Sequence, residues 1–187
     1  TEPDCPPVYS DTKAVYVNSS LSLGTRFTNG KIQLPEGAAV NLQNYTVHSL
    51  WGQTRATAAG SFEVLVADSS IEELLLVTND KGEVVLMGYF PEPPAEYIIS
   101  SASTAVALLL MYPFLKPVAE NAKASLIDRY KSEAEFDLLT AAIDSLSAEG
   151  ATVFSRNNTT LLEQVIKLVS KSYNEDRFRT GDSDPIH

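Results

Sequence analysis

The segment Pro91-Glu92-Pro93-Pro94 constrains the fold of this chain more than any other feature. Proline has no backbone N–H to donate and restricts the conformation of the residue before it, so the segment can continue neither a helix nor a central strand. We therefore expect a boundary near residue 92, with different secondary structure on its two sides.

Before this boundary, apolar residues recur at every second position, which is the pattern of strands with one buried face. The pairs and runs are Ile32 and Leu34, Val40 and Leu42, Tyr45 and Val47, and Phe62, Val64 and Val66. Turn-forming residues separate them at 28–30, 35–37 and 59–60. Asn79-Asp80-Lys81-Gly82 predicts a hairpin between strands at residues 73–78 and 83–90. This part of the chain predicts an antiparallel β-sandwich of about seven strands.

After the boundary, helical periodicity replaces the period of two. Ser101 or Ser103 can cap a first helix, which Pro113 ends, and a second helix follows Pro117. Four helices of this kind are too short to be stable singly, so we expect them to pack together or against the sandwich.

The third and fourth helices are predicted from caps and apolar stripes. Ser132 and Glu135 have the spacing of a capping box at the start of the third. Asn158 or Thr159 is the expected cap of the fourth. The stripe of the third helix is Phe136, Leu139, Ile143 and Leu146, and that of the fourth is Leu162, Val165, Ile166, Val169 and Tyr173.

The fold class predicted by these patterns is α+β, with an N-terminal antiparallel β-sandwich followed by a C-terminal bundle of about four short helices. The expected boundaries are a polar N-terminal segment at 1–13, a β-sandwich domain at 14–92, a helical domain at 93–175 and a polar tail at 176–187. Each of the two domains is expected to have a core of its own.

The chain is acidic, with 14 basic and 24 acidic residues and a net charge of −10. The resulting field opposes binding to a phosphate backbone, so nucleic acid is excluded as the expected partner. The longest apolar run, residues 105–115, is interrupted by Pro113 and has about half the roughly 20 residues of a membrane span, so no transmembrane segment is predicted. The single cysteine, Cys5, cannot form an internal disulfide and indicates a free or intermolecular thiol.

Residues 54–66, with the sequence TRATAAGSFEVLV, resemble the carboxypeptidase regulatory-like, transthyretin-like sandwich domains of many exported bacterial proteins. The resemblance lies in Thr57, Gly60 and Phe62, which form a threonine, three residues, Gly-x-Phe and then an alternating strand. Ala58 departs from the family pattern, in which an aspartate commonly follows the threonine. Such domains are accessory modules, so the resemblance implies a role in folding or attachment rather than chemistry.

Motifs for catalysis are scarce. The sequence contains no G-x-S-x-G, H-E-x-x-H, Walker or dinucleotide-binding motif, and one cysteine gives no metal cluster. His48 is the only histidine inside the chain, and no nucleophile or carboxylate stands beside it at motif spacing. We therefore expect no catalytic residue, no metal site and no cofactor. A hydrolase with an unmarked serine or carboxylate site is the alternative.

Tyr45 and Trp51 are the candidate ligand-binding residues, because they have the same parity in one predicted strand and the start of its loop, with His48 on the opposite side. Exposed aromatic side chains on a sandwich can stack on sugar rings or anchor a protein partner. The other interpretation is that Trp51, as the only tryptophan, belongs to the core.

The resemblance to exported sandwich domains implies a secreted or cell-surface protein, located outside the cell or in the periplasm, and the scarcity of catalytic motifs predicts no enzymatic activity. Its expected role is that of an interaction or structural module with a glycan or protein partner.

Overall fold

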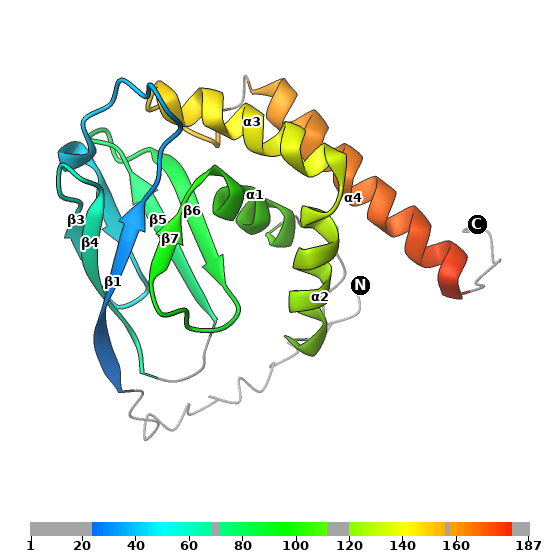
Figure 1. Ribbon diagram of the computed structural model, residues 1–187, viewed down its shortest axis with the longest axis horizontal. Coiled ribbons are helices and arrows are strands. Elements are labelled where there is room, and N and C mark those ends of the chain that lie inside the picture. The colour runs from blue at the N-terminus through cyan, green and yellow to red at the C-terminus, as the bar shows by residue number, and fades with distance from the viewer. Residues whose placement is uncertain (1–23, 69–71, 112–119, 156–157, 181–187) are drawn as a thin grey trace, which may run out of the picture.

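The computed structural model describes residues 24–68, 72–111, 120–155 and 158–180 (Figure 1). It confirms the predicted α+β fold, with seven strands in two sheets followed by four α-helices. The strands are β1 (Thr25–Ile32), β2 (Thr46–His48), β3 (Gln53–Arg55), β4 (Ser61–Ala67), β5 (Glu73–Thr78), β6 (Val84–Phe90) and β7 (Tyr97–Ile99). The helices are the short 3₁₀ helix η1 (Leu42–Asn44) and α1 (Ser101–Leu110), α2 (Glu120–Lys131), α3 (Ala134–Ala148) and α4 (Thr159–Thr180).

The first sheet has the strand order β4-β1-β7 and the second the order β3-β2-β5-β6. All pairs are antiparallel except β1 with β7, which run parallel and place Gly30 opposite Tyr97 and Ile32 opposite Ile99. The strand β7 follows the proline segment and was not predicted. The predicted strand at Val40 and Leu42 is also wrong, because this stretch forms a loop and η1.

The predicted turn at residues 28–30 is wrong as well, since these residues lie inside β1. Gly30 is buried and paired with Phe62 of β4, whose ring packs over it. The glycine is required here for this close approach and not for a turn. The hairpin of β5 and β6 is confirmed, with Gly82 at a φ of 77° in its loop.

Helix α1 covers β6, so that both faces of this strand are buried in its middle (Figure 1). The predicted cap of this helix at Ser101 or Ser103 is wrong, because Ser100 is the N-cap and accepts a hydrogen bond from the backbone N–H of Ser103. The hydroxyl of Thr104 accepts from Met87 N at 2.8 Å and lies 3.0 Å from Met87 O. Val84 O at the other end of β6 accepts hydrogen bonds from Val153 N and the Thr152 hydroxyl. The free edge of β6 is therefore covered by hydrogen-bonding partners.

The predicted capping box of the third helix is wrong. The cap of α3 is Glu133, and it makes no side-chain capping bond. Ser132 instead closes the end of α2, since its hydroxyl donates to Arg129 O at 2.7 Å. The N-cap position of α3 falls on Glu133, one residue after Ser132, so the Ser132–Glu135 spacing does not match the start of the helix. At α4, Asn158 accepts from Leu161 N at 3.4 Å, as predicted for a cap.

Helices α3 and α4 pack side by side (Figure 1). Lys171 of α4 forms ion pairs with Glu133 and, at 3.0 Å, with Glu135 near the start of α3. The apolar stripe predicted for α4 is partly wrong, because Leu162 and Ile166 are exposed. Between residues 159 and 171, where the side chains of this helix are described, the buried ones are Leu161, Val165, Leu168 and Val169, and the predicted Tyr173 lies outside this range. Helix α4 also continues past residue 176 into the predicted tail.

The buried side chains of strands and helices form one continuous cluster, in which Leu109 of α1 and Leu168 of α4 join the residues between the sheets. The division into two domains near residue 92 stays a prediction. The N-terminal segment with Cys5 and the end of the polar tail lie outside the described residues. Among the described helices, none has the length and apolar character to span a membrane.

Candidate functional site

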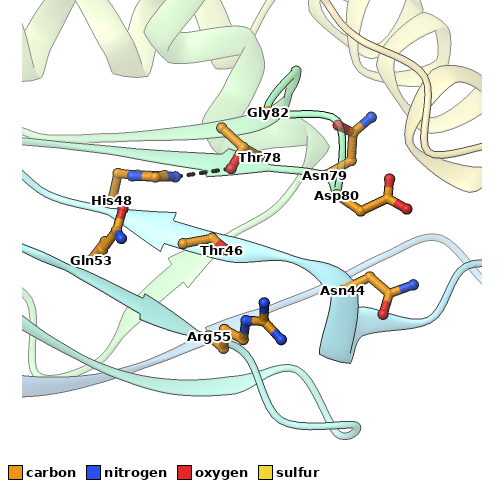
Figure 2. Close-up of a pocket in the computed structure, with 9 residues that line it drawn as sticks. All are labelled: Asn44, Thr46, His48, Gln53, Arg55, Thr78, Asn79, Asp80 and Gly82. Carbon is orange, nitrogen blue, oxygen red and sulfur yellow. Dashed lines mark hydrogen bonds between the residues drawn. The ribbon is translucent and has the colours of Figure 1, made fainter.

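A polar groove lies on the outer face of the second sheet (Figure 2). Successive side chains of a strand point to opposite faces, so Val47 is buried between the sheets while Thr46 and His48 face outward. The register of β2 places Arg55 and Thr78 opposite Thr46 on its two sides. The three neighbouring strands thus present their polar side chains in one row.

The groove has a volume of about 300 Å³ and is lined by Asn44, Thr46, His48, Gln53, Arg55, Thr78, Asn79, Asp80 and Gly82. Apart from Gly82, every lining residue has a polar or charged side chain. The His48–Gln53 pair lies at one end, and Asn44 and Arg55 lie at the other (Figure 2). The strands set the floor, and η1 and the β5–β6 loop set the rim.

His48 and Thr78 are hydrogen-bonded across neighbouring strands. Nε2 of His48 lies 2.9 Å from Oγ1 of Thr78, and the tautomer of the imidazole decides which atom donates (Figure 2). Within the part of the chain that the structure describes, no hydrogen bond orients the other ring nitrogen of His48. The pair has the reach of a base and a hydroxyl nucleophile but lacks the third group that usually positions the base.

The rim of the groove is fixed by the side chain of Asn79. Its Oδ1 accepts from the backbone N–H groups of Lys81 and Glu83, both at 3.0 Å. Its Nδ2 donates to the Glu83 carboxylate at 2.9 Å and to Gly150 O at 3.3 Å. The side-chain amide of Asn79 is therefore occupied by hydrogen bonds inside the protein, and these bonds fix the loop that carries Asp80.

Two opposite charges line the groove without pairing. Among the described residues, no carboxylate lies within ion-pair distance of the Arg55 guanidinium, although Asp80 lines the same groove. Burial and, to a smaller extent, the charge of Asp80 raise the pKa of the Tyr45 hydroxyl. Arg55 and the amides of Asn44 and Gln53 have no side-chain partner among the described residues.

The predicted pair Tyr45 and Trp51 does not form one exposed face. Tyr45 is 3% exposed and belongs to the core, whereas Trp51 is 36% exposed in the turn between β2 and β3. The Ser49 hydroxyl shapes this turn, since it accepts from Trp51 N at 3.1 Å and donates to Leu65 O at 2.5 Å. The prediction that Tyr45 and Trp51 share one face assumed a continuous strand, in which alternate side chains point the same way. The turn after β2 interrupts that strand before Trp51. Ligand binding by Trp51 alone stays a prediction.

The groove residues other than His48 were not singled out in the sequence. A signal was present, because Thr46 and His48 alternate with Val47, and Gln53 and Arg55 follow after a short turn. This pattern indicates a polar outer face, but it does not indicate that the face is hollowed. Among the described residues, no three His, Cys, Asp or Glu side chains gather as metal ligands.

The motif that resembles transthyretin-like domains lies in the connection from β3 to β4. Gly60 has a φ of 81°, and a Cβ atom there would stand 2.6 Å from Ile32 O, so the position requires glycine. Phe62 is buried in the core, at 5% exposure. These roles agree with the motif but occur in many sandwiches, so the resemblance stays a prediction. Comparison of the chain with models of protein families, with curated proteins and with solved structures finds no match.

Proposed function

We propose that this protein is a non-catalytic binding module of an exported or cell-surface protein, and that the polar groove binds a glycan. The observation that carries the proposal is the lining of the groove, in which amide, hydroxyl and charged side chains stand together on three paired strands. Sugar hydroxyls both donate and accept hydrogen bonds, as amide and hydroxyl side chains do. A lining without apolar side chains favours a hydrophilic ligand over a drug-like apolar one.

The exported location is a part of the proposal that rests on the resemblance of residues 54–66 to transthyretin-like domains. Immunodetection of the protein in the extracellular, surface and cytosolic fractions of source cells tests it. A protein found only in the cytosolic fraction contradicts this part of the proposal and leaves glycan binding to be judged separately.

Binding is tested with the full chain on immobilised neutral and acidic oligosaccharides, followed by calorimetric titration of each oligosaccharide that is retained. Asn44→Ala and Gln53→Ala should each weaken binding, because both side chains are exposed in the groove and have no hydrogen-bond partner among the residues that the structure describes. Asn29→Ala is the matched control, since Asn29 is exposed on the outer face of the other sheet. Absence of glycan binding, or equal effects of Asn44→Ala and Asn29→Ala, contradicts the proposal.

A hydrolase is the second candidate, and the contact of 2.9 Å between His48 and Thr78 is the observation that favours it. In that case His48 would deprotonate the Thr78 hydroxyl for attack on a carbonyl or glycosidic carbon. A screen of ester, peptide and glycoside substrates with the purified chain tests this candidate. Turnover that His48→Ala and Thr78→Val both reduce by about a hundredfold or more identifies an enzyme. Turnover that neither variant changes belongs to a contaminant or to another site.

A further inference from the structure

Among the side chains that line the groove, the guanidinium of Arg55 is the group best suited to bind an anion. Arg26, by contrast, lies 3.8 Å from the carboxylate of Asp68. Arg55 has no such partner among the described residues, and its side chain lines the groove from the edge strand β3. An arginine without an internal partner can present two parallel N–H donors to a planar anion.

The neighbours of Arg55 add neutral donors at the same end of the groove. Thr46 is its cross-strand partner, and Asn44 lies at this end as well (Figure 2). A hydroxyl and an amide beside a guanidinium suit a group that combines a carboxylate with adjacent hydroxyls. Asp80 lies on the rim near Asn44, on the same side of the groove (Figure 2), so its negative charge disfavours any anionic group beyond the one carboxylate that Arg55 can pair with.

The net charge of −10 makes this contact decisive. The long-range field of an acidic protein opposes an acidic ligand, so recognition of such a ligand depends on a direct ion pair that outweighs this repulsion. Resting on the proposed glycan-binding function, we propose that the glycan carries a carboxylate, as a hexuronic acid does, and that Arg55 binds this carboxylate.

The test uses two ligands that differ only at one carboxyl group, a neutral oligosaccharide that carries a single hexuronic acid residue and the methyl ester of the same oligosaccharide. Calorimetric titration of the full chain should give binding of the free acid at least about tenfold tighter than of the ester, the order expected for a hydrogen bond to a charged group. Arg55→Gln should remove this difference and leave the affinity for the ester within about twofold. Arg55→Lys should retain part of the difference in affinity between acid and ester, because lysine keeps the positive charge but lacks the two parallel N–H donors of arginine.

Lys81→Gln is the matched control, since Lys81 is an exposed residue of the β5–β6 loop that does not line the groove. It changes the net charge as Arg55→Gln does and should leave both affinities unchanged. Equal losses in the two variants would show that only the overall field acts. Equal affinities for acid and ester overturn the carboxylate inference while leaving glycan binding intact.

Two further outcomes separate the inference from the proposed function. If the wild-type chain binds neither form, and binds no other glycan, the proposed function fails and the inference fails with it. If a peptide with a single glutamate binds with dependence on Arg55 while the hexuronic acid oligosaccharide does not, the ligand is an acidic peptide and the inference is overturned. Folding of each variant is checked by its thermal unfolding curve before titration.

Discussion

The ring of Phe62 occupies the space above Gly30, because a Cβ atom added to Gly30 would stand 2.2 Å from Cζ of Phe62. The same Cβ would stand 2.6 Å from the backbone oxygen of Tyr97. The glycine therefore lets β1 approach a ring of β4 and the backbone of β7 at once.

Gly30→Ala should lower the free energy of unfolding by about 3 kcal/mol, the upper end of the usual cost of overpacking. Urea denaturation measures the change. Gly52→Ala is the control, since the nearest heavy atom to a Cβ there would be Leu65 Cβ at 3.8 Å. Equal costs at the two positions would contradict the packing of Phe62 over Gly30.

Phe62→Ala should cost about 3–5 kcal/mol, the usual range for removing a buried aromatic side chain. The neighbouring Glu63 points outward from the same strand and is exposed. Glu63→Ala should therefore stay within about 0.5 kcal/mol of the wild type. The pair of denaturation curves checks the register of β4, and similar effects at both positions would show that the register is wrong.

Thr104→Val should destabilise the protein by about 1–3 kcal/mol, because it leaves the buried N–H of Met87 without its acceptor. Thr140→Val is the same chemical change in α3, at a buried hydroxyl that has no hydrogen-bond partner. That variant should be neutral or more stable, since it removes an unsatisfied polar atom. Chemical denaturation of both variants makes the comparison. The reverse order of stabilities would contradict the role of Thr104 in joining α1 to β6.

Glu72 makes stability depend on pH. Hydrogen bonds from Lys123 and from the Tyr89 hydroxyl, the latter at 2.5 Å, lower the pKa of its carboxyl below the usual 4.5. A lowered pKa in the folded state gives stability that is present above 4.5 and is lost as the pH falls through the folded value. Glu72→Gln should therefore be less stable than the wild type at neutral pH, and the difference should shrink in acid.

Thermal unfolding across the acidic range measures this difference for Glu72→Gln and for Glu63→Gln, which removes an exposed carboxylate instead. A constant gap between Glu72→Gln and the wild type at all pH values would contradict the link of Glu72 to Lys123. The same gap in both variants would show a general charge effect.

A chain that stops at residue 92 should not fold cooperatively. It lacks β7, which pairs with β1, and α1, which covers β6. Near-ultraviolet circular dichroism and urea unfolding of this fragment test the expectation against the full chain. A cooperative transition in the fragment would show that the sandwich is an independent domain, as predicted from the proline segment.

Local patterns made some elements predictable. The β5–β6 hairpin follows from its turn residues, and α1 from its apolar periodicity, although its cap is one residue before the predicted Ser101. The stripe of α4 was predicted correctly at Val165 and Val169 but with Leu162 and Ile166 in place of the buried Leu161 and Leu168. Because apolar residues stand next to each other in this helix, its sequence is compatible with either set of residues facing inward. The contacts of α4 with the other helices determine which set is buried.

Elements and sites that depend on distant residues were not predictable in this way. The pairing of β7 with β1 and the close approach of Phe62 to Gly30 each join segments far apart in the chain. The groove also depends on residues far apart in the chain, since η1 and the β5–β6 loop form its rim and the strands β2, β3 and β5 form its floor. The residue types were visible in the sequence, but their common location was not.

The parallel partner of the first strand emerges late from the ribosome. While β1 to β6 are already outside, the edge of β1 that later binds β7 has no neighbour, and the outer face of β6 has no α1 over it. An uncovered strand edge beside apolar side chains is a site for association with other nascent chains. The parallel pairing thus closes this edge only once the chain has been made as far as β7, and until then the edge of β1 stays open to association.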